Sequence, residues 1–119
     1  MEHRVRELIF ENFGLQDLNP IIAGNERCLP SHQFGPAVRS YWLLHFVVSG
    51  KGVFRTSRGE YSLGKNDIFV IRPYEITYYE ADKSEPWEYM WIGFSSSIPL
   101  PMKLLENDTF YAPFLYDIF

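Results

Sequence analysis

The chain has 119 residues, a formal net charge of −4, and a composition that is 46% hydrophobic and 18% aromatic. This composition excludes a disordered chain, and the length suits a single domain with a packed core. The eleven Lys and Arg residues are scattered along the sequence. Nucleic-acid binding by this chain alone is therefore not expected, because such binding requires grouped basic residues that neutralise phosphates.

The sequence carries no sign of secretion or of a membrane anchor. Cys28 is the only cysteine, so an intrachain disulfide is impossible, as is usual for proteins of the cytoplasm. The charged N-terminus lacks the apolar segment of a signal peptide, and no apolar run has the length needed to cross a membrane. We expect a cytoplasmic protein with no membrane partner.

The N-terminal part of the chain is the least regular. Apolar residues between positions 5 and 13 recur at helical spacing, which predicts an N-terminal arm or short helix over residues 1–19. Residues 20–27 are predicted to form a first strand, and residues 30–36 a loop that contains His32.

Residues 39–94 are predicted to form a series of short, aromatic-rich strands. The predicted strands span residues 39–49, 53–57, 60–63, 68–71, 76–81 and 87–94. Gly50 and Gly52 permit a tight turn after the first of these. Short strands at this spacing indicate a closed or sandwiched antiparallel sheet. A small barrel of this kind can hold one small ligand in its interior.

The series of predicted strands ends before Ser97. Pro99 and Pro101 exclude a regular element, and residues 107–109 resemble a helix start followed by apolar residues at helical spacing. We therefore expect an arm over residues 1–19, a barrel over 20–97, and a linker with the start of a helical region over 98–119. Because the sequence ends among apolar residues, we also expect it to be part of a longer protein.

Three segments in fixed order carry a resemblance to a known family. They are CLPSHQFGPAVRSYWLLHFVVSGKGVF over residues 28–54, EYSLGKNDIFVIRPYEITYYEAD over 60–82, and PWEYMWIGFSS over 86–96. Together they resemble the N-terminal arm and cupin domain of AraC-family transcription regulators. The resemblance implies a mainly β fold, a cupin-like jelly-roll barrel with an N-terminal arm and the start of a C-terminal helix.

The resemblance also implies a function. The barrel would bind a small-molecule effector, a sugar or another small polar ligand, without catalysing a reaction and without a cofactor. Helices after the barrel would mediate homodimerisation. DNA would be bound only by a C-terminal helix-turn-helix domain, which is not in this sequence.

Three aromatic residues are the first candidates for effector binding. Tyr79, Tyr89 and Trp91 match effector-contacting positions of the family's arabinose-binding member, although Tyr89 replaces a His. An aromatic ring offers a flat apolar face to sugar C–H groups, and a Tyr hydroxyl adds a hydrogen bond. Because side chains alternate along a strand, Trp87, Tyr89 and Trp91 are predicted to share one face.

The sequence also departs from the arabinose-binding pattern. A basic residue that helps to hold the sugar there aligns near Gly35, which has no side chain. Arg39 is a possible substitute for it, and the alternative is that Arg39 forms a salt bridge with Glu88. His45, His32 and Trp87 are further candidates for the pocket or its lid. His45 is otherwise interpreted as a buried, hydrogen-bonded core residue.

Two rival hypotheses remain open. A metal-dependent cupin enzyme, such as an isomerase or dioxygenase, would need several converging ligands, but His45 stands alone on its strand. Cys28 has no evident His and acid partner that would make it a nucleophile. The sequence thus predicts no catalytic residue and no metal ligand. The other rival is a filled barrel that serves only as a dimerisation module.

Overall fold

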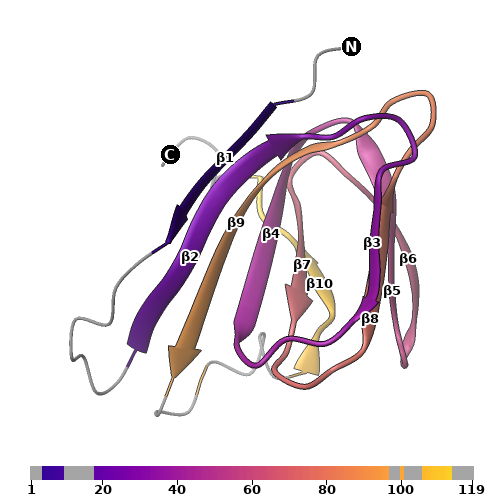
Figure 1. The fold of residues 1–119 in the computed structure, drawn as a ribbon. Helices are drawn as coiled ribbons and strands as arrows, with labels where there is room; N and C mark the ends of the chain where they lie inside the picture. Colours follow the sequence, from indigo (N-terminus) through magenta and orange to yellow (C-terminus); the bar gives the residue numbers. More distant parts are fainter. Residues whose placement is uncertain (1–3, 10–17, 97–99, 101–105, 114–119) are drawn as a thin grey trace.

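The computed structural model describes residues 4–9, 18–96, 100 and 106–113 (Figure 1). Their secondary structure is almost entirely strand. The strands are β1 (Arg4–Ile9), β2 (Leu18–Arg27), β3 (Gln33–Ala37), β4 (Trp42–Ser49), β5 (Lys51–Thr56), β6 (Gly59–Gly64), β7 (Asp67–Ile71), β8 (Thr77–Ala81), β9 (Glu88–Ser96) and β10 (Thr109–Tyr111).

The strands form two antiparallel sheets that face each other, as a jelly roll requires (Figure 1). The larger sheet has the order β1-β2-β9-β4-β7-β10, and the smaller has the order β3-β8-β5-β6. Neighbours within a sheet are often distant in sequence, such as β4 and β9. The predicted cupin-like jelly roll is thus confirmed.

The alternation of side chains explains why these segments pack as they do. On β4, Leu43, His45 and Val47 are buried between the sheets, whereas on the opposite face Phe46 is buried and Leu44 and Val48 are only partly buried. On β7, the four residues from Ile68 to Ile71 are all buried. A strand that is covered on both faces needs a continuous apolar run rather than an alternating one.

The hairpin between β4 and β5 turns at Gly50. This residue has a φ of +71°, a left-handed conformation that favours glycine. The backbone of Pro86 lies directly against it, in the space that a Cβ would occupy. The predicted glycine turn is confirmed, and the structure adds the close approach of a second chain segment as a reason for the glycine.

Aromatic rings fill the half of the sandwich between β5 and β7. Phe69 stacks on Phe54 with ring centroids 4.7 Å apart and on Trp87 at 5.4 Å. All three side chains are fully buried. The Trp87 ring also lies against Gly52, where an added Cβ would come within 2.5 Å of the ring. Close ring packing of this kind is a major source of core stability.

A buried carboxylate ties the segment before β10 to this filled half. Asp108 accepts hydrogen bonds from Tyr61 at 2.6 Å, from Thr56 at 2.9 Å and from Arg72 at 2.8 Å, and it also pairs with Arg58. Burial alone would raise the pKa of Asp108, but these hydrogen bonds together outweigh it and hold the pKa below its usual value.

Three predicted elements are corrected by the structure. Residues 4–9, predicted as part of an arm or a short helix, form strand β1, which pairs with β2. The predicted loop over residues 30–36 contains strand β3, which pairs with β8. The predicted helix start at residues 107–109 leads into strand β10, which pairs with β7. Residues 114–119, where that helix was expected to continue, lie outside the described residues.

The common cause of these errors is tertiary pairing. Each of the three segments takes its conformation from the backbone hydrogen bonds offered by another strand, which for β3 and β10 is remote in sequence. Within the part of the chain that the structure describes, no helix has the length and apolar character needed to span a membrane.

Candidate functional site

A cavity of about 180 Å³ lies between the two sheets, on the side of β2 and β3. Its walls combine aromatic, cationic and carboxylate side chains. The lining residues are Ile22, Glu26, His32, Phe34, Arg39, Tyr41, Leu43, His45, Tyr79, Tyr89 and Trp91.

The strand registers explain why these residues converge. Trp91 of β9 lies opposite both Gly24 of β2 and His45 of β4. Two residues away along the same strand, Tyr89 lies opposite Glu26. Side chains two residues apart point to the same face of a sheet. The larger sheet therefore presents a compact group of polar and aromatic side chains to the cavity.

The smaller sheet supplies the opposite wall. Phe34 of β3 pairs with Tyr79 of β8, and their rings stack with centroids 5.5 Å apart. The segment between β3 and β4 adds Arg39 and Tyr41. The cavity is thus lined by residues from both sheets and from a connecting segment.

Six of the seven residues predicted for the site line this cavity: Tyr79, Tyr89, Trp91, Arg39, His45 and His32. The structure places the seventh, Trp87, in the core, where it is fully buried and does not line the cavity. Trp87 precedes β9, and Phe69 covers its ring. The alternation of side chains along a strand predicts which face a residue occupies, but it does not reveal which side chains of the other sheet lie opposite that residue.

His45 is buried in an aromatic cage. Its ring stacks on Phe69 at 4.4 Å and meets Tyr89 edge to face at 4.7 Å. Burial, and to a lesser extent the charge of Arg39, lower the pKa of His45 from 6.5 to about 3, so the imidazole is neutral at pH 7. Its Nδ1 atom is buried without a hydrogen-bond partner. The burial predicted for His45 is confirmed, but its expected hydrogen bond is not found at Nδ1.

Arg39 is the cation of the cavity. Its guanidinium lies over the Phe34 ring, 4.5 Å from the centroid, and donates a hydrogen bond to the Tyr41 hydroxyl at 3.4 Å. The alternative salt bridge between Arg39 and Glu88 is not formed; the Glu88 carboxylate pairs with Arg27 at 3.5 Å. Arg39 is therefore held by aromatic contacts at the cavity, where its N–H groups can reach a ligand.

The two tyrosines remain protonated near neutral pH. Burial raises the pKa of Tyr79 to about 12, against a lowering effect of Arg39. Burial also raises the pKa of Tyr89, with a further contribution from Tyr79. Their hydroxyls can therefore donate as well as accept hydrogen bonds. With a neutral imidazole and one guanidinium nearby, the cavity is suited to hydroxyl groups.

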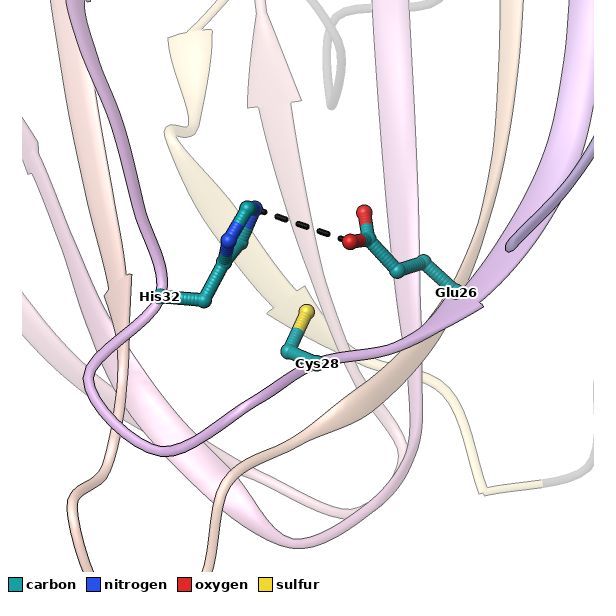
Figure 2. Close-up of side chains that lie close together, drawn as sticks. All are labelled: Glu26, Cys28 and His32. Carbon is teal, nitrogen blue, oxygen red and sulfur yellow. Dashed lines mark ion pairs between the residues drawn. The ribbon is translucent and has the colours of Figure 1, made fainter. Parts of the chain in front are cut away.

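A cluster at one end of the cavity was not predicted from the sequence. Glu26, Cys28 and His32 place one donor atom each within 4.8 Å of one another (Figure 2). Their spacing in the sequence is a weak signal of a shared site. Glu26 and Cys28 are two residues apart, and His32 follows Cys28 after a turn at Pro30 and Ser31. The conclusion that Cys28 lacks a His and acid partner was wrong.

Five lining residues were not predicted, Glu26 of this cluster among them: Ile22, Glu26, Phe34, Tyr41 and Leu43. Most of them come from β2, β3 and the segment before β4. They reach the cavity through sheet pairing over long sequence separations, and no local motif marks them.

Solved structures with this fold include several proteins of low sequence similarity. The YhaK protein of Escherichia coli superimposes with a TM-score of 0.68 at 15% identity, over 82% of this chain and 48% of YhaK. The cupin domain of Cnp3 from Schizosaccharomyces pombe gives 0.63 at 9% identity, over 82% and 69% of the two chains. Bacillus subtilis oxalate decarboxylase gives 0.62 at 16% identity, over 92% and 28%. These likenesses define the class of fold as a cupin-like jelly roll.

The family follows from sequence comparison. Residues 19–100 match the model of the AraC-like ligand binding domain, and the chain belongs to this family. The Msm operon regulatory protein of Streptococcus mutans is 36% identical over 91 residues, which cover 75% of this chain and 33% of the relative.

Two further relatives are also regulators of operons. The raffinose operon transcriptional regulatory protein RafR of Pediococcus pentosaceus is 35% identical over 88 residues, covering 72% of this chain and 32% of RafR. The lactose operon transcription activator of Staphylococcus xylosus is 31% identical over 81 residues, covering 68% and 29%. The chain thus spans about a third of the length of these curated relatives.

Proposed function

We propose that this chain is the effector-sensing domain of an AraC-type transcription regulator and that its cavity binds the effector. The observation that carries the proposal is the convergence of Tyr79, Trp91 and Arg39 on one cavity between the sheets. These side chains come from three separate parts of the sequence, and a barrel that served only as a scaffold would have no need to leave space between them.

We further propose that the effector is a carbohydrate. Aromatic faces suit the C–H groups of a sugar ring, while neutral hydroxyl and imidazole groups suit its hydroxyls. The names of two relatives, a raffinose operon regulator and a lactose operon activator, point to the same class. The cavity of about 180 Å³ is small beside the roughly 300–1,000 Å³ of pockets for drug-sized ligands, so we expect one sugar ring to enter it.

The role of the whole protein follows from the family. We propose that a longer chain binds DNA through a C-terminal domain, acts as a homodimer in the cytoplasm, and responds to the effector through the segment from His32 to Arg39. Both ends of that segment line the cavity. A ligand can shift an equilibrium only by its differential affinity for two states, and contacts made by this segment would supply that difference.

A metal-dependent cupin enzyme is the weaker alternative. The fold is shared with oxalate decarboxylase, but fold alone does not carry chemistry. Where such an enzyme would hold several ligands around its central histidine, the neighbours of His45 are the rings of Phe69, Tyr79, Tyr89 and Trp91. These residues do not fit a cupin metal centre, and the regulator relatives favour a sensor that catalyses no reaction.

The proposal is tested by thermal unfolding of the 119-residue chain with raffinose, lactose, galactose, glucose and other mono- and oligosaccharides. A ligand at a hundred times its dissociation constant adds about 2.7 kcal/mol to the free energy of unfolding. We expect one sugar class to give this shift, and Trp91→Ala to abolish it. If no carbohydrate raises the stability of the wild-type chain, the carbohydrate assignment is wrong.

A further inference from the structure

The cluster at the end of the cavity has the chemistry of a metal site. Glu26 is at the end of β2, Cys28 follows that strand, and His32 precedes β3 (Figure 2). Each offers one donor atom, an oxygen, a sulfur and a nitrogen, and the three atoms lie within 4.8 Å of one another. The side chains point toward a common centre in Figure 2.

We propose that Glu26, Cys28 and His32 form a Zn²⁺ site with three protein ligands and a fourth position open to the cavity. Glu26 would bind through a carboxylate oxygen, Cys28 through Sγ and His32 through Nε2. The site does not depend on the effector being a carbohydrate.

The distances suit a tetrahedral ion. Zinc–ligand bonds of about 2.0–2.3 Å place neighbouring ligand atoms roughly 3.3–3.8 Å apart. His32 Nε2 and Glu26 Oε2 already lie 3.6 Å apart. No pair of donor atoms is more than 4.8 Å apart, so a small side-chain adjustment would bring all three within reach of one ion.

The donor set selects the class of metal. A thiolate and an imidazole favour Zn²⁺ and related transition metals, whereas Mg²⁺ and Ca²⁺ require oxygen ligands. Three protein ligands with a free fourth position are typical of zinc sites that bind a water or a small ligand. Glu26 and His32 line the cavity, so that fourth position faces the space where an effector would enter.

The surroundings hold the donors in place. The Tyr89 hydroxyl donates a hydrogen bond to Glu26 Oε1 at 3.3 Å, which leaves Oε2 directed at His32. The backbone N–H of Cys28 donates to Trp87 O at 3.1 Å, and the carbonyl of His32 accepts a hydrogen bond from Ala81 at 2.8 Å. Such outer contacts orient metal ligands and tune their affinity.

Metal binding would require Cys28 to lose its proton. Burial raises the pKa of Cys28 to about 12, so the metal-free side chain is a thiol. On binding, the S–H proton is released to solvent and the thiolate sulfur donates to the metal. A bound cation reverses the local electrostatics and makes the thiolate the stable form.

The test is a titration of the EDTA-stripped 119-residue chain with Co²⁺, followed by competition with Zn²⁺. We expect one Co²⁺ per chain, with a thiolate-to-cobalt charge-transfer band that Zn²⁺ removes. His32→Gln and Cys28→Ser are each expected to weaken binding by at least about 100-fold, because they remove a ligand, whereas loss of an outer contact costs 10–100-fold.

Two variants serve as matched controls. His3→Gln removes a histidine outside the described residues, and Glu85→Gln removes an exposed carboxylate that pairs with Lys51; both are expected to bind as the wild type does. His32 is only partly buried, so its variant is expected to fold even if Cys28→Ser does not. The proposal is overturned if His32→Gln binds Zn²⁺ as tightly as the wild type, or if bound Co²⁺ lacks the charge-transfer band.

Discussion

The two halves of this sandwich contain the same types of residue, but one half is filled by them and the other encloses a cavity. Between β5 and β7, aromatic rings stack until the space is filled, with Trp87, Phe54 and Phe69 fully buried. Between β2 and β3, rings of the same kind line a cavity. The difference does not lie in the aromatic residues themselves, since Trp87, Tyr89 and Trp91 follow one another at alternate positions.

The partner across the sandwich makes the difference. Trp87 meets Phe69 and the bare backbone of Gly52, which allow close contact. Trp91 lies beside His45, with ring centroids 6.1 Å apart, and it faces the cavity. A ring packed on all sides contributes stability, while a ring with an open face can contribute binding.

The largest expected effect is a difference in stability between variants of Trp87 and Trp91. Trp87→Ala should lower the free energy of unfolding by about 3–5 kcal/mol, because it removes a fully buried ring from a packed core. Trp91→Ala should cost less stability, because one side of its ring already faces open space. Urea denaturation of both variants and of Trp87→Phe measures this. Equal losses at the two positions would show that the cavity is packed like the core.

A second prediction uses pH to probe the cavity. Because the pKa of His45 is lowered from 6.5 to about 3, the unfolded chain takes up a proton in this window that the folded chain does not. Stability therefore falls as the pH falls from 6.5 toward 3. In His45→Phe, the decline in the free energy of unfolding with falling pH should be smaller by roughly 1 kcal/mol per pH unit. Urea denaturation measures this slope at pH values above those at which most carboxylates become protonated. An unchanged slope would contradict a buried neutral imidazole.

A third prediction concerns the filled half. Asp108→Asn should cost about 2 kcal/mol at neutral pH, because it weakens several charged hydrogen bonds at once. The pKa of Asp108 is lowered, so its contribution is present above the unfolded value of 3.8 and is lost as the pH falls below it. The difference from wild type should then shrink in acid. Glu60→Gln, at an exposed position, is the control and should change little.

The smallest expected effect belongs to Arg39. Arg39→Lys keeps the charge but loses the planar contact with the Phe34 ring. Its cost in stability should be below about 1 kcal/mol, while affinity for the effector should fall measurably in calorimetry, because Lys lacks the planar set of N–H donors that Arg can offer to a ligand. A loss of stability larger than that of Asp108→Asn would assign Arg39 to the scaffold instead.

The core strands could be predicted because their signals are local. The apolar run of β7 and the alternation on β4 and β9 identify strands without knowledge of their partners. The β3 and β10 segments failed for the opposite reason, since each is a strand only because a neighbour remote in sequence completes its hydrogen bonds. The ligand-binding roles of Tyr79, Tyr89, Trp91 and Arg39 stay predictions.

The sequence by itself determined the strand pattern, the glycine turn at Gly50 and, through matching motifs, the family. Only the tertiary structure decided that Trp87 fills the core while Trp91 faces a cavity, and that Glu26, Cys28 and His32 meet. Local patterns fix which face of a strand a side chain occupies, because the pleat has a period of two. Which side chains stand opposite it depends on strand order and register, which hydrogen bonds between remote segments establish.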